Sequence, residues 1–477
     1  MGAASMKQDL SSKPKGAITV LLLVLPALVI TLGILVWGTA VSRSGFWADD
    51  FFNILHYNRS LGDLSYHANQ GKYVINVFWA LGTLAFGLSS VVPFLILNTL
   101  VFAVGVVVWL RVGTKGRWGI TDAWWIGGLF IATAAWLPTA LWSSNIVHSV
   151  AFLALALGVL AHERCMQAGT VRESMLWSLA GGAAWTLAVV SDLLYLGLLV
   201  LAAYCAFHQM LKLRRLGVAT PRAGLAVGFW NLLIPVVYFL AIAYPATTAS
   251  SAYASNGFQF IRPNLHFYKG VLAPTGLLVA VYIAVLAVGL VAAVLCIRRR
   301  DWFPMALLGA AGAVALGALI QSQQRDIHYM AMPLLLIFSA LAAGVHTVLI
   351  GRPKQRLQIR GGLLLAATVT LFLLFRQGAD VRSYFVQTPL GDSLAAFRSD
   401  AASLTPEGGT ICATLDLEPA QEALFSAEIS DENGFLVPPI SAARAYLVPM
   451  GRSCPGGTTA SRITVSLDPR GDFVAAG

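Results

Sequence analysis

Charged side chains are scarce in this sequence. Asp, Glu, Lys and Arg make up 11% of its 477 residues, which is less than half of the roughly 25% usual in soluble globular proteins. Hydrophobic residues account for 57%, so the chain has too few charged groups to cover a water-soluble fold. This composition excludes a soluble globular protein and predicts a membrane protein.

Several motifs that mark common enzymes and binding proteins are also absent. The chain has no zinc-type ligand spacing, no Walker phosphate loop, no dinucleotide-binding glycine fingerprint and no Gly-x-Ser-x-Gly elbow. Its formal charge of +10 is not the footprint of a nucleic-acid-binding protein, because the basic residues stand in short clusters between apolar runs. We therefore expect no nucleic acid among its partners.

Long apolar runs are what the sequence has in abundance. Runs able to cross a hydrocarbon core of about 30 Å predict an α-helical polytopic membrane protein with about 11 spans. The range is ten to twelve, because the two runs that meet at Ser191 and Asp192 also fit one kinked unit. The first run exceeds the apolar region of a signal peptide and no cleavage site follows it, which favours a retained anchor. The predicted spans are 17–41, 93–110, 119–137, 146–161, 174–190, 193–210, 224–244, 273–297, 303–320, 329–350 and 361–376.

Lys and Arg set the expected orientation in the membrane. With residues 1–16 as a cytoplasmic tail, the inner segments carry 19 of these residues and the outer loops carry 6, in agreement with the positive-inside rule. The composition then changes near Arg376, because residues 377–477 hold 12 of the 22 acidic residues, 6 basic residues and no lysine. We expect a transmembrane domain over 17–376 and a small extracytoplasmic α+β domain over 377–477.

The expected C-terminal domain contains a helix and strands. The pattern predicts a helix over 389–404 and strands over 409–417 and 462–467. Cys412 and Cys454 are the only cysteines in this part of the chain. An oxidising compartment allows a disulfide between them, and two unpaired buried thiols are the alternative.

The first outer loop, about 42–92, is far longer than a connection requires. A helix that begins near Trp47 places Asp49, His56 and Asp63 on one face, and a second short apolar helix is expected over 74–88. The first helix is predicted to lie at the membrane interface, and the second is predicted either to lie there or to insert partly.

The adjacent carboxylates of Asp49 and Asp50 have two interpretations. A helix N-cap explains one of them but not both. In the functional interpretation, one carboxylate takes a proton from an acceptor hydroxyl, while the other orients that hydroxyl or holds a divalent cation such as Mg²⁺ or Mn²⁺. The residues alone leave both open.

Other outer segments supply cations and imidazoles. Arg262, His266 and Lys269 stand close together in one loop, and Arg325 and His328 stand close together in another. Such groups suit the phosphate or diphosphate of a lipid head group. Snorkelling at the interface is the alternative for Lys269, and a local ion pair with the neighbouring aspartate is the alternative for Arg325.

Two smaller polar features lie at other predicted outer turns. Trp142, Asn145 and His148 form a patch between two spans, where a histidine either contacts substrate or is a hydrogen-bonded interface residue. Asp192 stands between two spans with almost no loop, where it either caps the next helix or touches substrate.

Two motifs give this pattern a family resemblance. Ala48-Asp49-Asp50-Phe51 opens the long outer loop, and Gln70-Gly71-Lys72-Tyr73 precedes a hydrophobic half-helix. With about 11 spans and a soluble outer tail, they resemble the GT-C superfamily of glycosyltransferases that use polyprenyl-phosphate sugars. The acidic pair followed by Gly-Lys is most similar to bacterial O-antigen glucosyltransferases. The resemblance covers residues 17–376.

The resemblance implies a multi-pass enzyme of the bacterial inner (plasma) membrane. It would move a sugar, with inversion, from a polyprenyl-phosphate donor to a glycan, lipid or protein acceptor on the outer face. Asp49 or Asp50 would be the base, and Arg325 with Lys72 or Arg262 would hold the departing phosphate. Lys72 stands where many relatives have arginine, which weakens bidentate phosphate binding. The other expected substrate-binding residues are His56, Tyr73, His148, His266, Lys269 and His328.

Two other classes of function remain open at this point. A transporter or flippase of a lipid-linked or small solute usually has polar or ionisable groups near mid-membrane and broken helices in paired repeats. The spans show no convincing charge and no obvious internal repeat. A non-catalytic scaffold for cell-envelope assembly is the third alternative, and it would tolerate loss of the outer acids.

Overall fold

The computed structural model describes most of the membrane part and the strands of the C-terminal part. The described residues are 17–41, 73–87, 92–114, 117–245, 257–321, 327–350, 366–379, 410–416, 435–436, 444–449, 461–467 and 473–475. Asp49, Asp50, His56, Lys72 and Arg325 therefore lie outside the described residues. The predicted interfacial helix near Trp47 and the predicted helix over 389–404 lie outside them too.

Within the described residues, each predicted span coincides for most of its length with helix. Eight helical segments are long and apolar enough to cross a membrane within the described ranges, so the chain is a multi-pass membrane protein. Three shorter apolar helices, α5, α15 and Ala366–Ala379, occupy the remaining predicted positions. The main helices of the membrane part are α1 (Ala17–Val41), α4 (Val92–Gly113), α5 (Ile120–Ala132), α7 (Ile146–Gln167), α8 (Val171–Ser191), α9 (Leu199–Arg215), α14 (Gly276–Arg298), α15 (Phe303–Leu319) and α16 (Ala331–Ile350).

Short helical segments connect and interrupt these helices. One predicted span is built from α10 (Thr220–Gly228), η4 (Phe229–Leu233), α11 (Ile234–Tyr238) and η5 (Phe239–Ala243), in which η4 and η5 are π-helical. The remaining short elements are α3 (Tyr73–Phe86), α6 (Leu137–Leu141), η2 (Ser143–Asn145), η3 (Leu193–Leu198), η6 (Phe258–Phe260), α13 (Ile261–Leu272) and η7 (Ile327–Met330). The position of α3 agrees with the short apolar helix predicted over 74–88.

The two runs that meet at Asp192 are separate helices. α8 ends at Ser191, η3 begins at Leu193, and both η3 and α9 pack back against α8. The side chain of Asp192 accepts a hydrogen bond from the backbone N–H of Leu194 at 2.9 Å. The predicted capping role of Asp192 is therefore confirmed, and the cap allows the chain to reverse direction with almost no loop.

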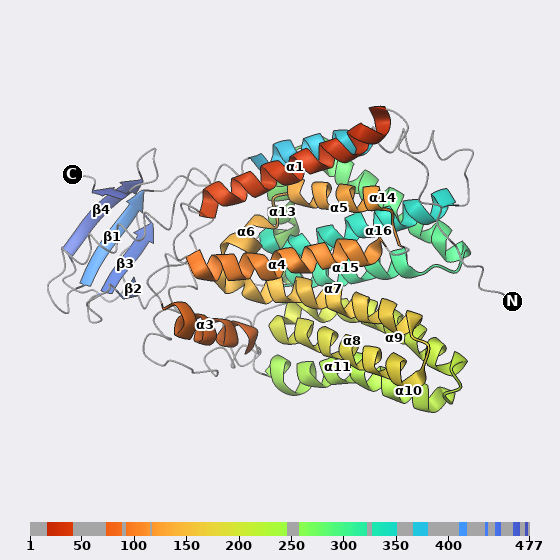
Figure 1. Cartoon of the computed structure of the whole chain (residues 1–477). Helices are drawn as coiled ribbons and strands as arrows, with labels where there is room; N and C mark the ends of the chain where they lie inside the picture. Colours follow the sequence, from red (N-terminus) through yellow and green to blue (C-terminus); the bar gives the residue numbers. More distant parts are fainter. Residues whose placement is uncertain are drawn as a thin grey trace.

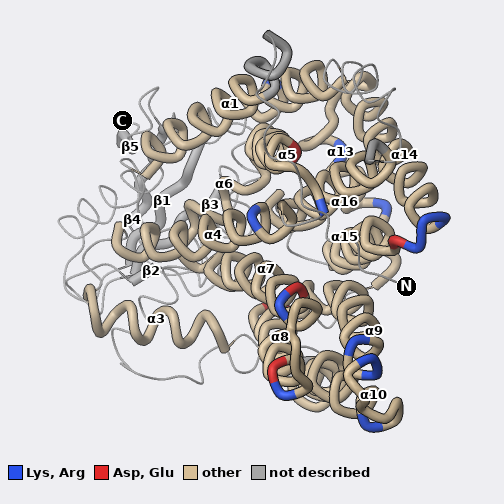
Figure 2. Tube along the Cα trace, turned by 45° about the vertical axis from the view of Figure 1, so that its right-hand side comes forward, with Lys and Arg blue, Asp and Glu red and all other residues tan. Residues whose placement is uncertain are grey.

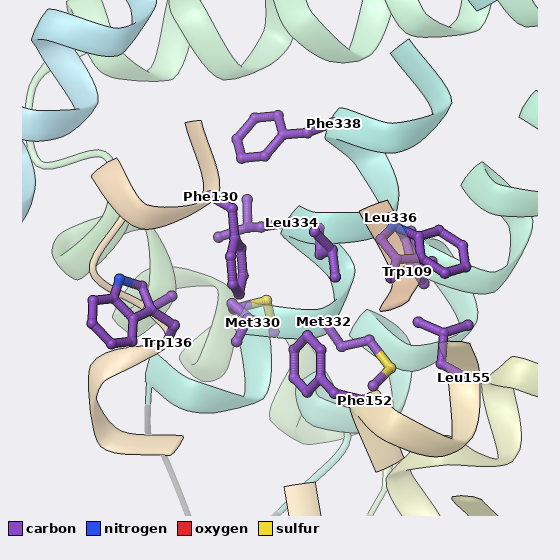
Figure 3. Packing of buried hydrophobic residues seen from close by; sticks show 14 of the residues in the cluster. Trp109, Phe130, Trp136, Phe152, Leu155, Met330, Met332, Leu334, Leu336 and Phe338 are labelled. Carbon is purple, nitrogen blue, oxygen red and sulfur yellow. The ribbon is translucent and has the colours of Figure 1, made fainter. Parts of the chain in front are cut away.

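α7 is the central helix of the bundle. It packs against α3, α4, α8 and α9, and α16 packs against α5, α14 and α15. Figure 1 shows α1 along one side of the bundle and α8 to α11 along the opposite side. The largest buried cluster fills the space between these layers, and Figure 3 shows Trp109, Phe130, Phe152 and Phe338 within it. Trp109 Nε1 donates to Ser339 Oγ at 2.9 Å, so its one polar atom is satisfied inside an apolar core.

The basic residues collect at one end of the bundle. Figure 2 shows Lys and Arg at the ends of α4, α9 and α14 and at the start of α10, which all lie at this end. Arg117 is the centre of an ionic network at this end: its Nε lies 3.1 Å from Glu163 Oε1 and its Nη1 lies 3.8 Å from Asp301 Oδ1. Its guanidinium also lies 4.4 Å from the ring centroid of Phe303. We call this the basic end. The opposite end, where α3 lies, is predicted by the positive-inside rule to face outward, and we call it the outer end (Figure 1).

The described strands of the C-terminal part form one five-stranded sheet. The strand order is β2-β3-β1-β4-β5, with β1 parallel to both β3 and β4 and the two edge strands antiparallel to their neighbours. The strands are β1 (Thr410–Asp416), β2 (Phe435–Leu436), β3 (Arg444–Pro449), β4 (Ser461–Leu467) and β5 (Phe473–Ala475). β1 and β4 match the two predicted strands, whereas β2, β3 and β5 were not predicted. Cys412 lies in β1 and Cys454 lies outside the described residues, so their disulfide stays a prediction.

Candidate functional site at the outer end

The outer end of the bundle contains an irregular turn between α5 and α7. After α5 the chain passes through Ala134, which has a positive φ of 56°, and continues into the short elements α6 and η2. Asn98 of α4 secures this turn, because its Nδ2 donates to the carbonyl of Thr139 at 2.7 Å and to that of Trp142 at 3.0 Å. Irregular backbone at membrane depth needs such partners because lipid offers none. This turn positions the start of α7.

Four aromatic and imidazole side chains meet beside this turn. His148 lies in the first turn of α7, and its Nδ1 is 2.6 Å from the hydroxyl of Tyr195 in η3. The ring of His328, from η7, has its centroid 4.5 Å from that of His148 and 4.1 Å from that of Tyr329. Trp142 stands edge-on to His328 at 6.0 Å. We call His148, Tyr195, His328 and Tyr329 the outer cluster.

The outer cluster lies where three segments meet, α7, η3 and η7. Both η3 and η7 also contact α15. All four side chains are buried, with exposed fractions between 1% for Tyr195 and 5% for Tyr329. Rings that can donate and accept hydrogen bonds are costly to bury without partners, so their grouping in a membrane protein marks a functional site more readily than a simple core.

The structure brings together only some of the predicted site residues. His148 and His328, predicted from two separate outer segments, are neighbours in the outer cluster. Tyr73, the first residue of α3, instead faces Tyr238 of α11, with ring centroids 6.5 Å apart. Asp192 belongs to the same region through its cap on η3, two residues before Leu194.

The predicted cations of α13 form a separate exposed stripe. Arg262, His266 and Lys269 are all exposed, at spacings of four and three residues that place them on one helix face. The buried Asn264 anchors the helix, since its Nδ2 donates to the carbonyls of Leu319 and Gln321 at 2.8 and 2.7 Å. α13 also contacts η7, so the stripe belongs to an element adjoining the outer cluster.

Sequence reasoning missed Tyr195. It stands in an apolar stretch that reads as an ordinary span, and no local motif marks it. The only available signal was Asp192 three residues earlier, because a capped short helix fixes the direction of the residues that follow. Its partner His148 lies 47 residues away, which local patterns do not detect.

No group of three or more His, Cys, Asp and Glu side chains that could hold a metal occurs within the described ranges. Asp49 and Asp50, the predicted cation ligands, lie outside those ranges. A divalent cation between them stays a prediction.

Comparison with solved structures identifies the fold. No family model and no curated protein matches the chain. The apo crystal structure of ArnT from Cupriavidus metallidurans is similar over 92% of both chains, with 14% identity and a TM-score of 0.50. The structure of the same protein bound to undecaprenyl phosphate is similar over 92% of both chains, with 15% identity and a TM-score of 0.49.

The chain has the same fold as ArnT. At 14% identity the similarity to ArnT concerns the fold, and it extends over 92% of both proteins. The family resemblance seen in the sequence and the fold seen in the structure therefore agree. Among the described residues, the outer cluster and the α13 stripe are the features that place polar groups together away from the basic end.

Proposed function

We propose that the protein is a membrane glycosyltransferase that moves a sugar from a polyprenyl-phosphate donor to a glycan, lipid or protein acceptor. The observation that carries the proposal is the agreement of its fold with apo ArnT along 92% of the chain. ArnT has also been crystallised with undecaprenyl phosphate, a lipid phosphate of the class that the predicted outer cations suit. Following the positive-inside rule, we place the enzyme in a bacterial inner membrane with a cytoplasmic N-terminus and an extracytoplasmic C-terminal domain.

The proposed reaction is a single displacement at the anomeric carbon. Asp49 or Asp50 takes the proton from an acceptor hydroxyl, and the hydroxyl oxygen attacks the anomeric carbon from the face opposite the phosphate. The bond between that carbon and the phosphate oxygen breaks, its electron pair stays on the oxygen, and the configuration inverts. Arg325 with Lys72 or Arg262 stabilises the charge on the departing lipid phosphate.

The first experiment measures sugar transfer by the purified full-length protein in nanodiscs. Radiolabelled polyprenyl-phosphate sugars are supplied with envelope extract as acceptor, and labelled product and released polyprenyl phosphate are quantified. Asp49→Ala or Asp50→Ala is expected to lower the rate by about 10² to 10⁴, the usual contribution of a general base. Asp63→Ala is the matched control from the same predicted loop, and we expect it to retain activity.

The outcomes separate the alternatives. If transfer survives both single changes, the assignment of the base is wrong. If no donor in the panel supports transfer and sealed vesicles accumulate labelled solute, the protein is a transporter. Loss of transfer in EDTA that Mg²⁺ or Mn²⁺ restores would support a cation between the carboxylates.

A further inference from the structure

The hydrogen bond between Tyr195 and His148 joins two helices inside the outer cluster. The tyrosine hydroxyl lies 2.6 Å from Nδ1 of the imidazole, a short distance for this kind of bond. Tyr195 is 1% exposed and His148 is 3% exposed. Water is thus largely excluded from the pair, which makes the hydrogen bond strong and its loss costly.

The backbone around Tyr195 is fixed on two sides. The backbone N–H of Tyr195 donates to the carbonyl of Asp192 at 3.0 Å, and the Asp192 side chain caps the same turn. On the other side Gly197 lies so close to α15 that a Cβ there would be 2.5 Å from the backbone nitrogen of Val314. η3 is therefore held against α15, and the direction of the Tyr195 side chain is set before it reaches His148.

The hydroxyl proton decides the tautomer of the imidazole. A tyrosine hydroxyl has one proton, a neutral histidine has one ring proton, and the hydrogen bond uses one of the two. Within the described part of the chain, the hydrogen-bond partner of the Tyr195 hydroxyl is Nδ1 of His148. If Nδ1 were the donor, the buried hydroxyl proton would lack an acceptor there, at the desolvation cost of an unpaired polar group. The favoured arrangement has Tyr195 donating to Nδ1, which leaves the ring proton on Nε2.

The imidazole thus held is in contact with η7. Its ring centroid lies 4.5 Å from that of His328 and 5.5 Å from that of Tyr329, with the Tyr329 ring nearly perpendicular to it at 82°. A change in the tilt of the His148 ring would therefore alter its contacts with His328 and Tyr329. Both belong to η7, the segment that leads into α16.

We propose that Tyr195 is a positioning residue of the transferase site, which holds His148 as the Nε2–H tautomer against His328 and Tyr329. In this form His148 is a neutral hydrogen-bond donor, suited to an environment that binds the oxygen-rich phosphate of a lipid-linked sugar. The kinetic part of this proposal rests on the proposed function, whereas the tautomer does not.

The tautomer is tested by ¹⁵N NMR on full-length protein in nanodiscs with ¹⁵N-labelled histidine rings. Comparison with His148→Asn assigns the His148 signals among the eight histidines. We expect Nδ1 unprotonated and Nε2 protonated in the wild type, and a mixture of tautomers in Tyr195→Phe. A protonated Nδ1 in the wild type, or signals unchanged in Tyr195→Phe, overturns the proposal whatever the activity.

The positioning role is tested by kinetics on the same variants. Tyr195→Phe is expected to lower kcat by about tenfold, the worth of one buried hydrogen bond, with the donor KM changed less than about twofold because Tyr195 does not itself bind donor. Tyr282→Phe, which removes a hydroxyl from α14, is the matched control and should keep both values. In a His148→Asn background, Tyr195→Phe should have no further effect.

Each other result contradicts the proposal in its own way. An unchanged kcat in Tyr195→Phe overturns the positioning role. If Tyr195→Phe and Tyr282→Phe lower kcat equally and lose equal thermal stability, Tyr195 has only a structural role. A wild-type protein that transfers no sugar contradicts the proposed function, and the NMR result still decides the tautomer.

Discussion

At the scale of single residues, Arg262 and Lys269 share one exposed face of α13 but have different expected roles. Arginine offers a planar fork that binds two phosphate oxygens, whereas lysine is a flexible point charge that also serves to reach the interface. We expect Arg262→Ala to raise the donor KM by about tenfold, the worth of a charged hydrogen bond, and to lower kcat as well, because the same guanidinium is proposed to stabilise the departing phosphate. Donor titrations in the transfer assay measure this.

Lys269→Ala tests the snorkelling alternative on the same face, two turns further along α13. We expect its donor KM to stay within about twofold of the wild type, as for a surface charge with no specific partner. Equal increases in both variants would show that the stripe acts only through its summed charge, and no change in either would remove Arg262 from the phosphate site.

At the scale of elements, the contact between α4 and α7 depends on Gly105. A Cβ added at this position would lie 2.7 Å from the backbone nitrogen of Leu153 and 2.9 Å from its Cα. Backbone atoms cannot rotate away as a side-chain tip can, so the helices must separate. Gly105→Ala is expected to destabilise the protein by about 1–3 kcal/mol, measured by thermal unfolding in detergent.

Gly312→Ala is the matched substitution in a helix with open space around the glycine. Nothing lies within 4 Å of its added Cβ, and alanine favours the helical state. We expect unchanged or slightly higher stability. A Gly105→Ala protein as stable as Gly312→Ala would mean that α4 and α7 are not packed as closely as the structure shows.

At the scale of the whole molecule, the ionic network of Arg117 joins segments from distant parts of the sequence. Glu163 lies in α7 and Asp301 lies between α14 and α15, and the side chains of all three residues are 17–26% exposed. Burial lowers the pKa of Arg117, but the neighbouring Tyr204 hydroxyl and the carboxylates of Glu163 and Asp301 together outweigh it, so the pKa is raised. The cation is therefore charged at every working pH.

Removal of this cation should loosen the basic end of the bundle. We expect Arg117→Gln to lower the free energy of unfolding by about 1–3 kcal/mol, because it leaves two partly buried carboxylates uncompensated. Arg222→Gln, an exposed cation in α10, is the control and should change stability by less than about 0.5 kcal/mol. Equal thermal unfolding of the two variants would contradict a bracing role for the network.

Local sequence alone determined much of the architecture. In the described residues, each predicted span is mainly helical and eight helical segments are long and apolar enough to cross a membrane, because hydropathy over about 20 residues reflects the fixed thickness of a bilayer. β1 and β4 were predicted because their apolar residues are bounded by turn-forming ones, whereas β2 and β5 are two and three residues long and leave almost no local pattern. The composition step near Arg376 falls within the helix Ala366–Ala379, since a helix already formed continues a few residues past a change in composition.

The outer cluster was decided only by the tertiary structure. His148 and His328 were predicted as separate features, and Tyr195 was not predicted, although the three lie on α7, η7 and η3 in contact. Their grouping depends on the Asn98 hydrogen bonds that shape the turn before α7 and on the close approach of η3 to α15. The sequence by itself determined which segments enter the membrane, because the bilayer acts on each segment separately. Which side chains meet at its outer end follows from how the helices pack on one another, and that packing joins residues far apart in the chain.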